Sequence, residues 1–168
     1  MNSFLGFLTV FAALVFAPAA HATAIGNKPF EKVVYVSAAS TASSSASGAS
    51  YASAKNWQDQ DLFAIPANVV IEQVYAVVDE ALAGATAVSI GDDDSATGFV
   101  TSASSPLAST GVNWFEQTDK GAYLKIGANA RAKFYSATGK EVKLYVTGTA
   151  TTGKVRFYFK GYSFGAGP

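Results

Sequence analysis

The chain has no cysteine, one histidine, one methionine and few charged residues. The absence of cysteine excludes disulfides, iron–sulfur clusters, thiolate zinc sites and cysteine nucleophiles. Twelve Lys and Arg residues balance twelve Asp and Glu residues. This zero net charge argues against binding of nucleic acid, which requires a basic face. The length of 168 residues suits one domain with a sizeable core.

The single histidine, His21, lies in an N-terminal segment with the features of a leader. Residues 4–17 are almost entirely apolar, Pro18 follows them, and small residues stand on both sides of His21. No Lys or Arg precedes the apolar run, in contrast to a standard signal peptide. Two interpretations stay open. Residues 1–22 are a secretory leader cleaved near Ala22, or they are a retained arm or anchor that contacts a membrane through residues 4–17.

Cleavage near Ala22 would leave a chain without histidine, cysteine or methionine. Such a chain has no Ser-His-Asp or Cys-His arrangement, no histidine general base and no histidine-ligated metal. We therefore predict a protein that is not an enzyme.

Short runs of β-branched and aromatic residues alternate with Gly, Pro, Asn and Asp, and no run has the period of a helix. We expect an extended arm over residues 23–31. A single all-β domain over residues 32–168 follows, an antiparallel β-sandwich of jelly-roll type. Strands are expected at residues 32–37, 69–78, 85–90, 122–126, 132–136, 140–147 and 154–162.

Three local interpretations accompany this fold. Residues 79–84 and 148–153 are expected to be turns, so that the last two strands form a hairpin. Residues 38–54, almost wholly Ala, Ser, Thr and Gly, are a flexible loop or a flat strand. Simple alternation places one set of side chains of residues 69–78 on a common face: Val69, Ile71, Gln73, Tyr75 and Val77.

An acidic run follows Gly91, at the end of an expected strand. Asp92 and Asp94, at alternate positions and close to Ser95 and Thr97, offer the oxygen ligands that Ca²⁺ prefers. The alternative is a solvated turn in which the Asp side chains accept hydrogen bonds from backbone N–H groups. No other cofactor is predicted.

Aromatic residues with a polar tip suggest an interaction surface. In residues 154–162, Val155, Phe157 and Phe159 should face the core, and the residues between them should face outward. Tyr and Trp are favoured at interfaces, although a Trp in a sandwich is also a common core residue. We predict an interface formed by Arg156, Tyr158, Lys160, Tyr162 and Trp114.

The stretch from Ile65 to Phe99 contains "IPANVVI", alternating valines, "ALAGA", "VSIGD" and a polar loop that ends in "GF". This order of pieces resembles a pattern of tailed-phage virion proteins, and the final strand "KVRFYFKGY" resembles the one that closes the same proteins. The resemblance covers residues 65–162. The leader departs from this pattern, because tailed-phage proteins that assemble in the cytoplasm do not normally carry export signals.

The resemblance implies a small β-sandwich that acts in the virion by subunit packing, without catalytic residues. The expected roles are capsid decoration, minor capsid protein or spike subunit. The expected partners are copies of the chain itself, as a homo-oligomer such as a trimer, and the major capsid or other virion proteins. The alternative is a secreted or cell-surface bacterial β-sandwich module for adhesion or carbohydrate binding, released by cleavage near Ala22.

Overall fold

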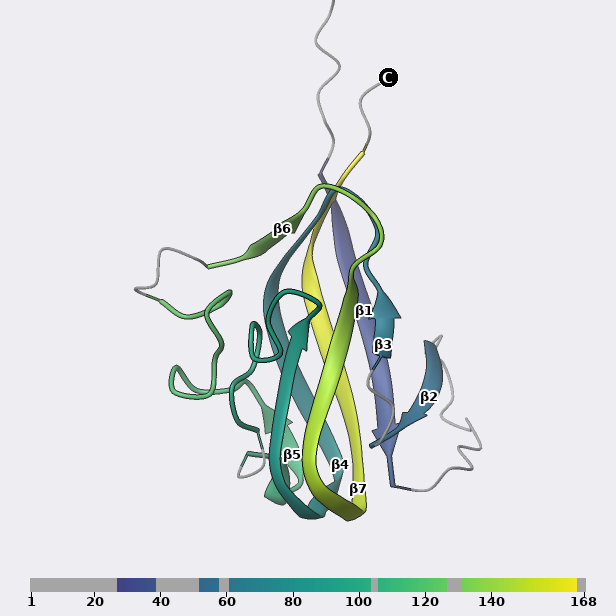
Figure 1. The fold of residues 1–168 in the computed structure, drawn as a ribbon, viewed down its shortest axis with the longest axis vertical. Helices are drawn as coiled ribbons and strands as arrows, with labels where there is room; N and C mark the ends of the chain where they lie inside the picture. The colour runs from purple at the N-terminus through teal and green to yellow at the C-terminus, as the bar shows by residue number, and fades with distance from the viewer. Residues whose placement is uncertain (1–26, 39–51, 58–60, 104–105, 127–130, 166–168) are drawn as a thin grey trace, which may run out of the picture.

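The computed structural model describes residues 27–38, 52–57, 61–103, 106–126 and 131–165 (Figure 1). The described residues form β-strands and one 3-10 turn, without an α-helix, so the all-β prediction is confirmed. In chain order the elements are β1 (Asn27–Ser37), β2 (Ala52–Asn56), β3 (Asp61–Ala64), β4 (Val69–Asp92), η1 (Pro106–Ala108), β5 (Gly111–Asn113), β6 (Lys133–Tyr135) and β7 (Glu141–Phe164).

The predicted leader, residues 1–22, lies outside the described residues. In the part of the chain that is described, no helix is long and apolar enough to cross a membrane.

The fold is built on the antiparallel pairing of two 24-residue strands, β4 and β7. The pairing runs from Val69 opposite Ser163 to Asp92 opposite Val142. The two-stranded ribbon runs to one end of the molecule, curls and returns, so that its halves lie in two layers (Figure 1). The first layer contains residues 69–78 of β4 and 155–163 of β7, and β1, β5 and β6 extend it. The second layer contains residues 85–92 of β4 and 142–148 of β7, and β3 extends it. The result is a curled antiparallel sheet with a sandwich-like core.

The predicted hairpin of residues 140–147 and 154–162 is wrong. Both segments belong to β7, and each is hydrogen-bonded to β4 rather than to the other segment. The two expected turns, residues 79–84 and 148–153, lie opposite each other in β4 and β7, where the register shifts repeatedly. Bulges of this kind sharpen twist and bending without ending a strand. Residues 79–84 and 148–153 therefore do change the direction of the chain, but they bend a continuous ribbon and do not separate two strands.

Glycine is needed where the ribbon curls. Gly84 has φ +85°, and a Cβ atom there would lie 2.2 Å from the Thr149 carbonyl oxygen. Gly148 has φ +87°, and a Cβ atom would lie 2.9 Å from the Gly84 carbonyl oxygen. L-residues with a side chain rarely adopt this conformation, and no other residue leaves this space empty. The two glycines let the strands cross closely at the bend.

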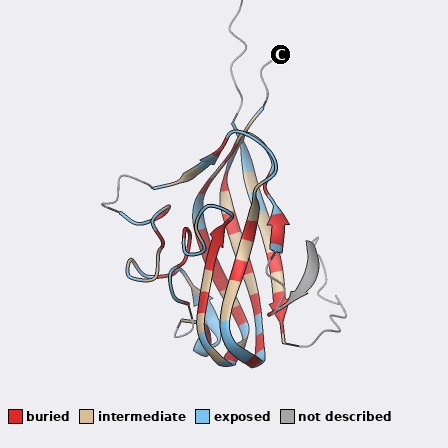
Figure 2. Cartoon of the chain, viewed as in Figure 1, coloured by how far each residue is buried: buried red, intermediate tan, exposed pale blue. Residues whose placement is uncertain are grey.

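Aromatic side chains fill the space between the layers. The Phe159 ring lies 5.0 Å from Phe63 of β3 and 6.3 Å from Phe99, and Trp57 lies 6.3 Å from Phe157. All five are buried. Buried positions run along the strands of both layers (Figure 2). Burial of each such ring contributes about 1.5–3 kcal/mol. The predicted inward direction of Val155, Phe157 and Phe159 is confirmed.

A bulge in β4 overturns the alternation predicted for residues 69–78. Ile71 pairs with Gly161, but Gln73 pairs with Lys160, so Glu72 is an extra residue in β4. Beyond it, Val74 and Ala76 point into the core, while Gln73 and Tyr75 point outward. The prediction that Ile71 and Tyr75 share a face is therefore wrong, because one inserted residue reverses the side chains that follow it as far as Val78.

Smaller differences concern the ends and the loops. β1 begins at Asn27, inside the expected arm of residues 23–31, because it pairs with β7 along its whole length. β2, at the end of the small-residue segment, pairs with β1 in parallel, in contrast to the expected antiparallel order. Residues 39–51 lie outside the described residues. The expected strand at residues 122–126 is a turn, in which the Leu124 N–H donates to Gly121.

Gly84→Ala tests the close approach at the bend. We expect a loss of about 3 kcal/mol or more in the free energy of unfolding, from backbone strain and from the clash with Thr149. The matched control is Gly139→Ala, because Gly139 also has a left-handed φ of +97° but has open space around its Cβ position. The control should lose only about 1–2 kcal/mol. Equal losses in urea denaturation would contradict the proposed role of the bend.

Candidate interaction surface

Asp92 is buried at the end of β4, where it accepts four hydrogen bonds. Its Oδ1 accepts from the N–H groups of Asp94 and Ser95 and from the Tyr123 hydroxyl, each at 2.9 Å. Its Oδ2 accepts from the Tyr135 hydroxyl at 2.6 Å. No local sequence pattern points to either tyrosine, because they lie 31 and 43 residues away from Asp92. Asp92 therefore joins the end of β4 to β6 and to the loop that contains Tyr123.

The protonation of the two tyrosines supports this anchoring role. Burial, followed by the hydrogen bond to Asp92, raises the pKa of Tyr123 well above its usual value. The same two causes raise the pKa of Tyr135 further, because Tyr135 is more deeply buried. Both hydroxyls thus keep their protons and donate to the carboxylate throughout the physiological pH range.

The two following carboxylates turn outward to lysines. Asp93 lies 2.8 Å from Lys143 Nζ, and Asp94 lies 2.6 Å from Lys140 Nζ and 3.5 Å from Lys133 Nζ. Hydrogen bonds from these lysines lower the pKa values of Asp93 and Asp94. The pairs therefore stabilise the fold above the pKa of the unfolded carboxyls, and this stabilisation is lost as the pH falls through the folded values.

The structure thus separates the predicted calcium ligands. Asp92 is buried and accepts from two tyrosines, whereas Asp94 is at the surface and accepts from Lys140. Among the described residues, no group of three or more His, Cys, Asp or Glu side chains is arranged to hold a metal ion. A calcium ion would have to displace the existing donors, and its binding stays a prediction.

The predicted interface residues come together on the outer face of the first layer. Opposite residues of antiparallel strands point to the same side of a sheet. A ring contact with Tyr75 adds Trp114 to one cross-strand row, and a ring contact joins Phe134 to Phe164 of the neighbouring row. Successive rows from the bend are Tyr35–Arg156–Val77–Val112, Val33–Tyr158–Tyr75–Trp114, Glu31–Lys160–Gln73, Pro29–Tyr162–Val70–Phe134 and Asn27–Phe164. We call the first two rows the lower band, the third the polar row, and the last two the upper band.

A stack of three rings forms the centre of the lower band. The Tyr75 ring lies 4.6 Å from Tyr158, with 5° between their planes, and 4.3 Å from Trp114. Tyr75 is only 9% exposed, because its neighbours cover it, whereas Trp114 is 56% exposed. The sequence analysis predicted Tyr158 and Trp114 but missed Tyr75, because simple alternation took no account of the bulge at Glu72.

The charged members of this face are paired with neighbours on the same face or at its border. The Arg156 guanidinium binds Asp79 through two hydrogen bonds of 2.9 and 2.5 Å. Lys160 Nζ lies 3.2 Å from Glu31 and 5.5 Å from the centre of the Tyr75 ring. The hydrogen bond to Glu31, followed by contact with Tyr75, raises the pKa of Lys160. Exposed pairs of this type are each worth about 0–1 kcal/mol, so they orient side chains more than they stabilise the fold.

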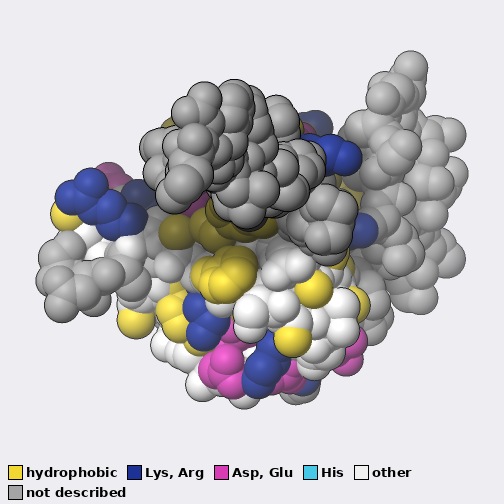
Figure 3. All heavy atoms as spheres, turned by 90° about the horizontal axis from the view of Figure 1, so that it is seen from above, with side chains coloured by type: hydrophobic (Ala, Val, Ile, Leu, Met, Phe, Trp, Pro, Cys, Tyr) yellow, Lys and Arg dark blue, Asp and Glu magenta, His cyan; other side chains and the backbone are white. Residues whose placement is uncertain are grey.

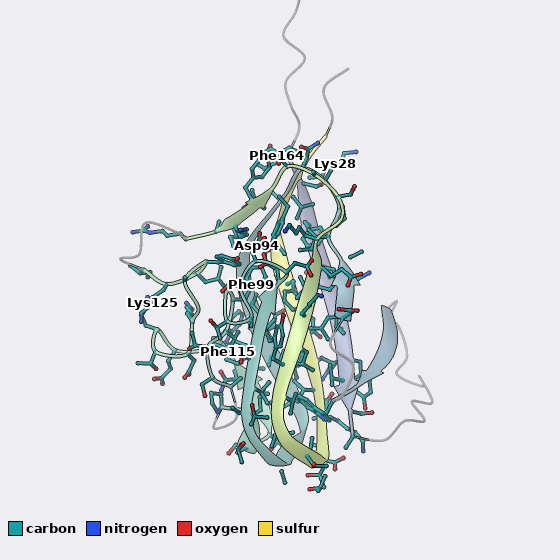
Figure 4. The ribbon with its side chains drawn as sticks, in the orientation of Figure 1. Lys28, Asp94, Phe99, Phe115, Lys125 and Phe164 are labelled. Atoms are coloured by element: carbon teal, nitrogen blue, oxygen red, sulfur yellow. The ribbon has the colours of Figure 1, made fainter. Side chains whose placement is uncertain are left out.

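The upper band lies at the end of the molecule where the described chain begins and ends. Phe134 of β6 packs edge-on against Phe164, with 6.1 Å between ring centres, and Tyr162 is exposed beside them. Figure 4 labels Phe164 and Lys28 at this end, and Figure 3 looks down on it. All five predicted interface residues therefore lie on one sheet face.

Removal of Asp92 tests whether this carboxylate is a structural anchor. Asp92→Ala should lower the free energy of unfolding by about 3 kcal/mol or more, since it leaves one buried hydroxyl, one partly buried hydroxyl and two N–H groups without their acceptor. Tyr135→Phe, which removes one of the four donors, should cost about 1–2 kcal/mol.

Asp94→Asn is the matched control for these variants, because it loses only exposed ion pairs. Its effect should stay within about 1 kcal/mol. Thermal unfolding followed by circular dichroism measures all three variants. A tolerated Asp92→Ala substitution would exclude the anchor.

Comparisons with protein families, with curated proteins and with solved structures find no match to this chain. The resemblance to tailed-phage virion proteins therefore stays a prediction. The function has to be inferred from the residues of the outer face and of the Asp92 loop.

Proposed function

We propose that this protein is a non-enzymatic structural protein that acts by packing the outer face of its first layer against another protein. Together with the resemblance of residues 65–162, this favours a virion role, as a capsid decoration protein, minor capsid protein or spike subunit. The observation that carries the proposal is the concentration of Trp, Tyr and Arg side chains on one sheet face, described above.

The composition of this face is that of a protein interface. Of the five exposed large hydrophobic side chains among the described residues, four belong to this face, and the fifth, Ile126, lies in the loop that contains Tyr123; the four are Val112, Trp114, Phe134 and Tyr162. Soluble monomers rarely expose a large contiguous apolar patch unless a partner covers it. Trp, Tyr and Arg are also the residues that most often dominate binding energy at interfaces. The face therefore combines exposed apolar side chains with residue types that often anchor protein interfaces.

The arrangement of the rings favours a protein partner over a sugar. A sugar ring stacks on the flat face of an aromatic ring, as a base does. Both faces of the Tyr75 ring are already occupied, by Trp114 on one side and Tyr158 on the other. The stack thus presents ring edges and hydroxyl groups, which suit a mixed apolar and polar protein surface. A carbohydrate-binding module, the alternative, would depend on the remaining face of Trp114.

Incorporation into particles tests the proposed function. The wild-type chain should be found by mass spectrometry in virions purified from a culture that produces it. Trp114→Ser combined with Tyr158→Ser should reduce incorporation at least tenfold, because the substitutions remove the exposed part of the ring stack. Val112→Glu, which places a charge on the same face without touching the stack, should have a similar effect.

Tyr145→Ser is the matched control, because Tyr145 lies in the half of β7 that forms the second layer. It should incorporate as the wild type does, and circular dichroism should show that all variants fold. The proposal is overturned if the wild-type protein is absent from virions and is secreted with Thr23 as its first residue. In that case, loss of binding to a glycan array on Trp114→Ser would support the carbohydrate-binding alternative.

A further inference from the structure

We infer that the outer face of the first layer is self-complementary and binds a second copy of this chain around a twofold axis. The axis would lie in the interface, parallel to the sheet, and would run along the polar row, Glu31–Lys160–Gln73. This inference rests on the proposed function, since it names the partner of the same face. It commits to a dimer contact in place of the trimer expected from the resemblance.

The first support is the order of side chains along β7. From the bend outward, the outer face reads Arg156, Tyr158, Lys160, Tyr162 and Phe164. Lys160 has a tyrosine two residues away on each side, and its row is polar across three strands. The face is therefore a mainly apolar band, a polar row and a second mainly apolar band, an order that reads the same in both directions from the polar row.

A twofold contact uses this symmetry directly. Twofold interfaces place the same patch of both subunits in contact, so residue i meets j and j meets i. Rotation about the polar row places the lower band of one copy, with Tyr158 and Trp114, over the upper band of the partner, with Tyr162 and Phe134. The two polar rows then meet each other, and both apolar bands lose their contact with water.

The second support is charge. Three cation–anion pairs lie on or beside this face: Lys160 with Glu31, Arg156 with Asp79, and Lys154 with Glu80 at 2.7 Å. These pairs balance each other in charge, and the whole chain has zero net charge. A partner with a strong net charge of either sign would gain no electrostatic attraction here, whereas a second copy meets no net repulsion. In the dimer, the flexible Lys160 side chain can pair with Glu31 of the partner subunit.

Sedimentation velocity on the full chain tests this arrangement. The wild type should sediment as a dimer at micromolar concentration. Lys160→Glu should raise the dissociation constant at least tenfold, because the shared polar row would then carry acids and no cation. The double variant Glu31→Lys with Lys160→Glu exchanges the charges within the row and should restore the dimer.

Lys143→Glu is the matched control, because Lys143 is also an ion-paired lysine of β7 but belongs to the second layer. It should leave the dimer intact. A wild-type chain that remains monomeric at all concentrations overturns the inference, including the case in which another segment of the chain covers the face. A trimer overturns the twofold axis.

Cross-linking locates the contact, and the absence of cysteine makes the result unambiguous. Gln73→Cys, in the polar row, should give a covalent dimer with a bis-maleimide whose spacer is about 10–15 Å, since packed sheets lie about 10 Å apart. Tyr145→Cys, on the second layer, should give none. A covalent dimer from Tyr145→Cys but not from Gln73→Cys would place the contact on the wrong layer and overturn the inference.

The two proposals fail in different ways. A dimer that is held by this face but is absent from virions retains the inference and rejects the virion role. A monomer that enters virions and loses this ability on Trp114→Ser retains the role and rejects self-association.

Discussion

The pairing of β4 with β7 is the constraint on which the rest of the structure depends. The two strands stay hydrogen-bonded from one end of the ribbon, around the bend, to the other end. Both layers are therefore made from the same two strands, and the remaining short strands add to their edges. Gly84 and Gly148 let the ribbon curl tightly enough for Phe63 and Phe159 to meet between the layers. Without the bend there is one flat ribbon and no core.

The bend also separates the molecule into parts with different tasks. Buried positions run along both layers (Figure 2), and the side chains that point inward are apolar. The end of β4 is held by the Asp92–Tyr135 contact. The Asp92 carboxylate accepts hydrogen bonds from two tyrosines, and we therefore assign it a structural role. The outer face of the first layer is instead rich in exposed aromatic residues, which the stability of the core does not require. That separation is the physical basis for the proposed assembly function.

Local patterns predicted the segments well but not their pairing. The outward positions of Arg156, Tyr158, Lys160 and Tyr162 were correct, because β7 alternates without interruption over that half. The hairpin was wrong, because a glycine-rich turn signal looks the same whether the chain reverses into its neighbour or bends within a longer ribbon. Tyr75 was missed because one extra residue, Glu72, reverses the side-chain directions, and no short-range pattern marks the bulge.

The sequence by itself determined the all-β class and the inward set of Val and Phe in the last strand. It also determined that the chain has no cysteine and only one histidine. These properties depend on composition and on the two-residue period of a strand, which are local. Only the tertiary structure decided that Tyr123 and Tyr135 meet Asp92, that Trp114 stacks with Tyr75 and Tyr158, and that one face collects the exposed aromatics. Each of these contacts joins residues far apart in the chain, and their partners depend on register, which long-range pairing alone sets.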